Sequence, residues 1–291
     1  MDRDTRILEI EAQMADPAFW ADKENAQTLV REYQFLKEGG EGDPHDMGSC
    51  TLAILAGAGG DDAEDFVHLL RRMYEGYAGN KGWGVRELHA NENNHGGYRN
   101  VLLEIGGSGA YGRLKHESGV HRLVRISPFN AQAKRQTSFA LVEVLPMLTT
   151  GEKIELKEDD LDMQFTKSGG AGGQNVNKRE TAVRIVHIPT NISVHVSSER
   201  SQQANREKAL ELLQAKLMVR QKEEEEAAAK GRSIATDTKN EWGSQMRSYV
   251  LHPYKMVKDH ETGHESGNPD KVLAGDLDEF IDAAEKVDQA D

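Results

Sequence analysis

The residues best suited to chemistry form a glycine-rich run that also carries amide side chains, residues 168–175 with the sequence SGGAGGQN. Glycine tolerates positive φ angles and lets the backbone pass very close to another surface. The run lacks the Gly-Lys-Ser/Thr ending of a nucleotide phosphate loop and the ribose-binding acid of a dinucleotide site. A flexible surface turn is the alternative. Because Lys178, Arg179 and Arg184 follow, we interpret the run as a hydrogen-bonding tip on a basic stem.

The segments around this run must position it, and their patterns predict strands and one long helix. Apolar residues alternate at Leu161, Met163 and Phe165, as in a half-buried strand. Further strands are expected at 182–188 and 192–196, followed by a helix over about 201–230 with a leucine stripe. The pattern therefore predicts a compact β-α unit.

The rest of the chain predicts helices and strands in mixed order, which indicates an α+β fold. Helices are expected within 5–38, from Asp61 to about Tyr77, and at 272–287; strands are expected at 51–56, 84–89, 100–105, 111–114 and 138–144. No side chain near the glycine run is a good general base, so its chemistry would be positioning and electrostatics.

Composition limits the classes of protein to which the chain can belong. No apolar run reaches the roughly 20 residues that cross a bilayer, and the first residues lack an apolar signal core, which favours the cytoplasm. The single cysteine, Cys50, excludes an intrachain disulfide and a cysteine-based zinc cluster, and we predict a buried spectator thiol. Net charge is -13, yet residues 113–135 hold six bases and one acid, and residues 167–220 hold nine bases and four acids. Since binding depends on local fields, RNA is a plausible partner.

Residues 172–174 read Gly172-Gly173-Gln174 within the longer segment SGGAGGQNVNKRETAVRIVHIPT. This segment resembles the Gly-Gly-Gln motif of class I peptide chain release factors. The resemblance implies that these three residues promote hydrolysis of peptidyl-tRNA inside the ribosome, so the chain would not be a stand-alone enzyme and would need no cofactor or metal ion. The family also includes codon-independent rescue hydrolases, so the motif indicates the reaction and not the codon.

A second motif, Ser127-Pro128-Phe129, resembles the codon-reading loop of the bacterial release factors that read UAA and UGA. The type that reads UAA and UAG carries Pro-X-Thr there. A serine hydroxyl both donates and accepts hydrogen bonds, which suits A or G at the second codon position. The resemblance also assigns Gly59 and Asp62 to a helix start that meets the first base, with Asp62 where the family usually has Glu.

Three further positions are assigned by the resemblance. Thr137 retains the residue that hydrogen-bonds the third base, whereas Gln136 stands where most relatives have a histidine that stacks between codon bases. An amide stacks less strongly than an aromatic ring, so we predict weaker discrimination at the third base. Trp242 lies in a segment resembling the switch loop and the strand after it, and would stack on ribosomal RNA; a half-buried core aromatic is its alternative role.

The resemblance implies a multidomain chain with a mixed β-sheet codon-recognition domain at 47–150, completed by 236–291. A compact β-α Gly-Gly-Gln domain would occupy 151–235, and a shortened helical N-terminal segment 1–46. The implied partners are the ribosome with ribosomal RNA of both subunits, the mRNA stop codon and peptidyl-tRNA, without a membrane. A recycling GTPase and a glutamine methyltransferase would be further partners, the latter giving N5-methylglutamine at Gln174.

The function predicted from this resemblance is translation termination at UAA and UGA. One alternative is a codon-independent ribosome-rescue hydrolase, but such proteins usually lack the codon-reading domain. A ribosome-binding factor without hydrolytic activity is the other alternative, and the intact Gly172-Gly173-Gln174 argues against it.

Overall fold

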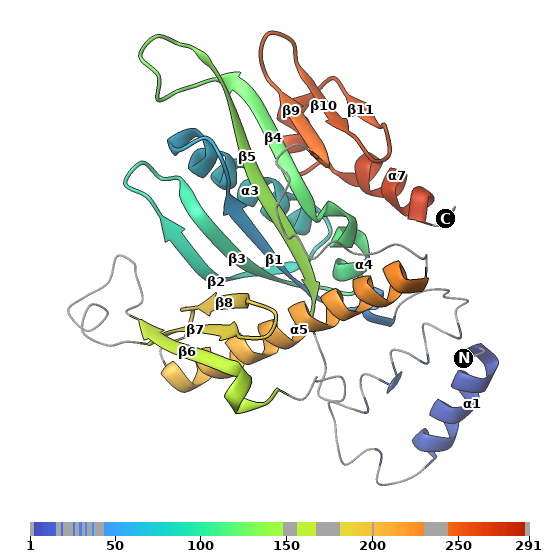
Figure 1. Ribbon diagram of the computed structural model, residues 1–291. Helices are drawn as coiled ribbons and strands as arrows, with labels where there is room; N and C mark the ends of the chain where they lie inside the picture. Colours follow the sequence, from blue (N-terminus) through green and yellow to red (C-terminus); the bar gives the residue numbers. More distant parts are fainter. Residues whose placement is uncertain are drawn as a thin grey trace.

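Two β-sheets organise the protein in this computed structural model (Figure 1). The structure describes residues 3–15, 19, 26, 29, 30, 33, 37, 44–147, 156–166, 181–199, 201–229 and 244–288. Sheets and helices mix along the chain, as the predicted α+β class requires. No helix in these ranges is both long and apolar enough to cross a bilayer.

The larger sheet has eight strands in the order β11-β10-β9-β4-β5-β1-β3-β2. Their bounds are β1 Cys50–Ala56, β2 Gly84–Glu92, β3 Tyr98–Gly106, β4 Gly119–Ile126, β5 Arg135–Pro146, β9 Arg247–Val250, β10 Met256–Asp259 and β11 Glu265–Ser266. Neighbouring strands are antiparallel except β4 and β9, which are parallel. Residues late in the chain therefore extend a sheet that the early residues begin.

Helix α3 (Asp61–Asn80) packs on this sheet, as its sequence pattern predicts. Its buried side chains recur every three or four residues and form the core with β1, β3 and β5: Phe66, Leu70, Met73, Tyr74 and Tyr77. The acidic first turn suits the positive end of the helix dipole. Cys50 is buried in the same core, as predicted, and burial raises the pKa of its thiol to about 12.

Two predicted elements differ from the structure. Residues 111–114 were expected as a strand but belong to helix α4 (Ala110–Leu114), because Ala110 and Leu114 lie one turn apart and both are buried. The expected single helix over 272–287 is two helices, α6 (Pro269–Leu273) and α7 (Asp278–Asp288). Gly275 separates them with φ +104, where a Cβ would lie 2.5 Å from the amide nitrogen of Tyr77. The helix breaks there because the backbone passes against α3.

The smaller sheet has the order β6-β7-β8, and helix α5 (Gln202–Ala229) packs on it. Its strands are β6 Leu161–Thr166, β7 Ala182–His187 and β8 Ile192–Val196, close to the predicted segments. The core of this β-α unit contains Val183, Ile185, Val196 and Leu213, and it is completed by Leu88 from β2 of the larger sheet. The β-α unit therefore rests against β2.

Polar contacts accompany this packing between the β-α unit and the larger sheet. The rings of His89 on β2 and His195 on β8 stack with centroids 4.5 Å apart. Nδ1 of His89 lies 2.6 Å from Oγ of Ser197. Burial, followed by the neighbouring His195, lowers the pKa of His89 to about 4. Two ion pairs bridge the same contact, Lys208–Glu104 at 2.8 Å and Lys216–Glu143 at 2.6 Å.

Short elements connect these layers: the 3-10 turns η2 (Pro44–Met47), η3 (Lys115–Glu117) and η4 (Glu158–Asp160). Near the amino terminus, α1 (Arg3–Met14) confirms the first of the two short helices expected within 5–38. The second falls mostly outside the described residues.

Candidate functional site

The predicted codon-reading residues converge at one end of the larger sheet. In the pairing of β1 with β3, Leu55 faces Asn100, and in the pairing with β5, Ala56 faces Ala140. The carboxyl end of β1 therefore lies beside the start of β3 and the middle of β5, and the first residues of β5 extend beyond it. Figure 1 shows the β4–β5 loop, the start of α3 and the β2–β3 turn at this same end of the molecule. We call this region the codon end: residues 57–65, 93–97 and 126–137.

The turn before α3 is tied to β5. The Gly57 amide donates to the Phe139 carbonyl at 2.8 Å, and the Phe139 amide donates to the Ala58 carbonyl at 3.0 Å. Gly59 has φ +139, and a Cβ there would lie 3.0 Å from Oγ of Ser138. Glycine is required by both the angle and the close approach. Gly59 is exposed, so this backbone is open to a partner.

Ser127 and Asp62, both assigned to the codon by the family resemblance, contact each other directly. The Ser127 hydroxyl donates to Oδ2 of Asp62 at 2.6 Å, and the Phe129 amide donates to Oγ of Ser127 at 3.1 Å. Arg125 reaches Oδ1 of Asp62 at 3.4 Å and Oδ2 of Asp65 at 2.5 Å. A serine and two carboxylates are therefore bound together around one guanidinium.

This network limits what the Ser127 hydroxyl offers. A hydroxyl has one proton and two lone pairs. The proton is directed at Asp62 and one lone pair at the Phe129 amide, which leaves one lone pair. In this state Ser127 offers a base only an acceptor, whereas its sequence alone allowed both donation and acceptance. Ser127 is also buried, so a base reaches its hydroxyl only when neighbouring atoms move.

The other predicted codon residues are exposed around this network. Pro128 and Phe129 both face solvent, as do Gln136 and Thr137 at the start of β5. Alternate residues of a strand share a face, so Gln136 points to the same side as Ser138, against which Gly59 packs. Gln136 is thereby placed on the side where α3 begins.

The β2–β3 turn also lies at the codon end (Figure 1), a location that sequence reasoning did not assign to it. Oδ1 of Asn93 accepts hydrogen bonds from the His95 amide at 2.8 Å and the Gly97 amide at 2.9 Å. The Asn93 side chain also donates to Glu64 of α3 at 2.5 Å. The turn is thus fixed to α3. The signal available in the sequence was Asn93-Asn94-His95-Gly96-Gly97 between two strand patterns, which indicates a hairpin but not its neighbour.

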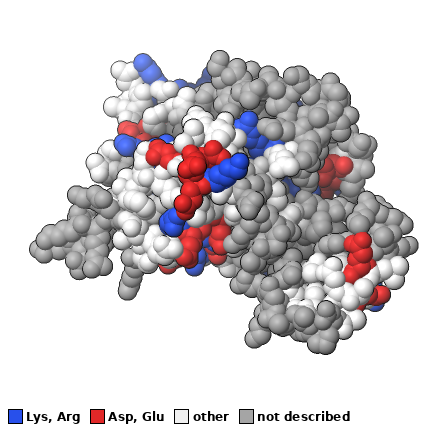
Figure 2. Space-filling model, turned by 60° about the horizontal axis from the view of Figure 1, so that its bottom comes forward, with Lys and Arg blue, Asp and Glu red and all other residues white. Residues whose placement is uncertain are grey.

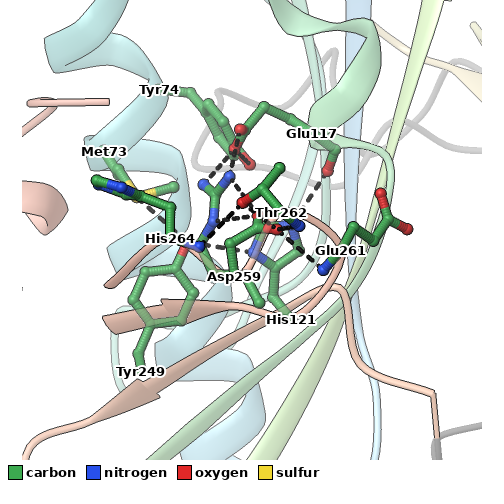
Figure 3. Close-up of polar contacts among 10 residues, drawn as sticks. Met73, Tyr74, Glu117, His121, Tyr249, Asp259, Glu261, Thr262 and His264 are labelled. Atoms are coloured by element: carbon green, nitrogen blue, oxygen red, sulfur yellow. Dashed lines mark hydrogen bonds and ion pairs between the residues drawn. The ribbon is translucent and has the colours of Figure 1, made fainter. Parts of the chain in front are cut away.

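Buried polar side chains anchor β9, the strand expected after the switch loop, and Figure 3 shows Glu117, His121 and Asp259 gathered together there. The side chain of Arg247 is 1% exposed and donates to both oxygens of Glu117 at 2.7 Å. It also contacts Asp259 of β10 at 3.1 Å. Burial alone would lower the pKa of Arg247, but Glu117 raises it well above its ordinary value. The strand is held to η3 and β10 by charge.

His121 completes this cluster in its neutral form. Burial, followed by the nearby Arg247, lowers the pKa of His121 to about 4. Its ring nitrogens lie 3.2 Å from the Tyr249 hydroxyl and 3.1 Å from the Glu117 carbonyl. The sequence had indicated neither Arg247 nor His121 as a site residue, because Arg247 lies 130 residues from Glu117 and His121 lies 128 residues from Tyr249.

The basic stretch at 113–135 is less available to RNA than its composition suggests. Half of its bases are ion-paired: Arg113 with Asp278, Asp282 and Glu285; Lys115 with Asp46 and Asp288; Arg125 with Asp62 and Asp65. The acids of α7 pair with two of the six bases, Arg113 and Lys115. On the face that Figure 2 presents, acidic and basic side chains of the described residues are interspersed. Lys134 and Arg135 remain exposed at the codon end.

The predicted hydrolysis residues Gly172, Gly173 and Gln174 lie outside the described residues, as does the predicted switch-loop residue Trp242. The strands on either side of the first three are described: β6 ends at Thr166 and β7 begins at Ala182, and these two residues pair. Within the described ranges, no group of three His, Cys, Asp or Glu side chains is arranged to hold a metal ion.

Comparison with known proteins identifies relatives along most of the chain. Two protein-family models match, the PCRF domain over residues 40–142 and the RF-1 domain over residues 150–261. Peptide chain release factor 2 of Listeria monocytogenes serotype 4b is 40% identical over 332 residues, covering 96% of this chain and 90% of that protein. Peptide chain release factor 2 of Clostridium perfringens is 44% identical over 272 residues, covering 89% and 73%. The solved structure of RF2 of Thermus thermophilus is similar with a TM-score of 0.73 and 35% identity, covering 97% and 93%.

Proposed function

Because the chain belongs to the family of peptide chain release factor 2, we propose that it terminates translation at UAA and UGA in the cytoplasm. The observation that carries this proposal is the contact between Asp62 and Ser127 at 2.6 Å. It joins the α3 start and the β4–β5 loop, the two segments assigned to the first and second codon bases. The partners would be the ribosome, the mRNA stop codon and peptidyl-tRNA.

Base chemistry supports reading by these residues. Adenine offers an amino donor where guanine offers a carbonyl acceptor. The Ser127 hydroxyl accepts from the first and, after turning its proton away from Asp62, donates to the second. Gly59 lets the backbone at the start of α3 approach uracil, and Thr137 would bond the third base. Gln136 and the exposed Pro128-Phe129 would complete the surface around the codon.

We further propose the division of labour along the chain. Residues 47–150 with 236–291 would read the codon, 151–235 would promote hydrolysis, and 1–46 would be peripheral to release. Two features support the division: the larger sheet draws its strands from both parts of the first range, and the smaller sheet with α5 lies within the second.

In the hydrolysis step, water attacks the ester carbonyl, giving the peptide carboxylate and a tRNA with a free ribose hydroxyl. We propose that the backbone amide of Gln174 donates to the negative charge that develops on the reacting ester oxygens. The Gln174 side chain would admit water and exclude larger nucleophiles, and Gly172 and Gly173 would allow the backbone to aim the amide. Trp242 would stack on ribosomal RNA. A glutamine methyltransferase that modifies Gln174 and a recycling GTPase would be additional partners.

Peptide release from ribosomes programmed with UAA, UGA, UAG or a sense codon tests this function. We expect release on UAA and UGA and little on UAG, since one good base contact discriminates by roughly ten- to a hundredfold. Equal release on UAG and UGA would contradict the codon assignment. Equal release on sense and stop codons would place the chain among rescue hydrolases.

A matched variant separates hydrolysis from binding. Gly173→Ala should retain ribosome binding and slow release by about a hundredfold, the scale of losing one oxyanion donor. Parallel loss of binding and release would show that the Gly-Gly-Gln segment is only an anchor.

A further inference from the structure

Two aromatic rings from separate hairpins meet on the surface of the codon end. The rings of His95, from the β2–β3 turn, and Phe129, from the β4–β5 loop, have centroids 6.2 Å apart and an interplanar angle of 52°. Both residues are exposed, and Phe129 retains 42% of its accessible surface. The pair is therefore partly unburied, although aromatic rings usually bury their faces.

The position of His95 is fixed by its neighbours. Asn93 accepts from the His95 amide and is itself bound to Glu64 of α3. The second oxygen of Glu64 accepts from Arg99, at the other side of the turn, at 3.2 Å. A Cβ on Gly97 would lie 2.8 Å from the Glu64 carbonyl carbon, so the turn is packed directly on the helix. The imidazole is presented by an ordered turn, at a small entropic cost for binding.

From this arrangement we infer that His95 and Phe129 form a stacking platform for one unpaired base of the mRNA at or beside the stop codon. The inference rests on the proposed function, since Phe129 adjoins the codon-reading Ser127. A stacking ring suits any base, because every base has a π-face. The exposed Lys134 and Arg135 lie in the same loop region and favour the phosphates of such a strand.

The platform is also relevant to Gln136, the position at which this chain differs from the residue expected in its relatives. Relatives are expected to carry a stacking histidine at that position, whereas this chain has an amide. His95 supplies an imidazole at the same end of the sheet from a different element. Stacking energy at the codon end would therefore come from the β2–β3 turn in addition to β5.

Release kinetics of full-length variants test the platform. His95→Ala should raise the factor concentration for half-maximal release on UAA and UGA by roughly tenfold, the scale of one lost base-aromatic stack. His95→Tyr, which keeps a ring, should stay within about threefold of the unchanged protein. His95→Leu, which keeps apolar bulk without a ring, should behave like His95→Ala. The matched control is Asn94→Ala, an exposed neighbour in the same turn.

A fluorescent base identifies the nucleotide. The probe is 2-aminopurine, placed in turn at the third codon position and at the nucleotides on either side of the codon. We expect one position whose fluorescence is quenched by the unchanged protein and by His95→Tyr, and not by His95→Ala. Absence of such a position, or equal half-maximal concentrations for all variants, would overturn the platform. A kinetic loss in His95→Ala without any responding mRNA position would also overturn it, by assigning the ring to ribosomal RNA.

This test separates the platform from the proposed function. Codon-dependent release by the unchanged protein is measured first and stands or falls without His95. Thermal unfolding of each variant, followed by circular dichroism, shows that the exposed substitutions leave the fold intact.

Discussion

Replacing Asp62 by asparagine should shift codon preference toward UGA. The Ser127 hydroxyl donates to the Asp62 carboxylate at 2.6 Å, so it faces a codon as an acceptor. Adenine meets an acceptor with its amino group, whereas guanine needs a donor at its carbonyl. Reading guanine therefore requires that the hydroxyl leave a charged partner. Asparagine weakens this hold, and its amide can donate to Oγ of Ser127, which frees the hydroxyl proton for guanine.

The magnitude follows from the bond that must break. Hydrogen bonds to charged groups contribute about 1.5–3 kcal/mol, and neutral ones about 1 kcal/mol. The substitution removes the difference between the two, about 0.5–2 kcal/mol, so the ratio of release on UGA to release on UAA should rise by about two- to thirtyfold. Arg125 keeps its contact with Asp65 at 2.5 Å, which limits wider rearrangement.

The assay is the release rate at subsaturating factor on ribosomes programmed with UAA or UGA. Asp61→Asn is the matched control, because Asp61 is the exposed neighbour in the same helical turn and loses the same charge. We expect its UGA to UAA ratio to stay unchanged. A ratio in Asp62→Asn that stays constant, or that moves toward UAA, would refute the argument that Asp62 holds the Ser127 proton.

Three further predictions concern stability. Glu117→Gln leaves the buried Arg247 without its bidentate partner and should lower the free energy of unfolding by about 3–5 kcal/mol in urea titrations. A loss below about 1 kcal/mol would show that Asp259 alone is enough to compensate the charge of Arg247. His89 and His121 have pKa values of about 4, below the ordinary 6.5, so the folded state favours their neutral forms. The free energy of unfolding should be highest above about pH 6.5 and fall as the pH drops toward 4, and the fall should be shallower in His89→Gln. An equal fall in the unchanged protein and in His89→Gln would contradict the role of the His89–His195 contact. Cys50, with a pKa of about 12 and no exposure, should react with a thiol reagent only after unfolding, and fast reaction of the native protein would contradict its burial.

Sequence patterns predicted the elements whose signals are local. The sequence of helix α3 combines a regular apolar spacing with an acidic first turn. In the structure the apolar residues are buried and the acids lie in the first turn, as predicted. Strand β1 and the strands of the smaller sheet were predicted for the same reason. Strand β4 was missed because Val120, His121, Leu123 and Val124 are buried without alternation. One of the two partners that accompany the burial of His121 is the Tyr249 hydroxyl, which lies 128 residues away and in no window around β4.

Charge patterns predicted less, because pairing is a tertiary property. Arg113 and Lys115 belong to a basic stretch along the chain, but α7 supplies acids to both from residues more than a hundred positions later. Composition alone therefore overstated the positive field there. The family resemblance could assign Ser127 and Asp62 individually, whereas the hydrogen bond from the Ser127 hydroxyl to Asp62 follows only from the folded structure.

The codon end depends on strand order more than on any single motif. Ser127, Gly59 and His95 come from three connections that are separated along the chain. They meet because β4, β5, β1, β3 and β2 are adjacent in the sheet with their registers aligned at one end. A one-residue shift in a β register turns every side chain to the opposite face. The contacts of Gly57 with Phe139 and of Asn93 with Glu64 fix the turns at this end. Changes at these turn contacts should therefore alter codon reading without touching a base.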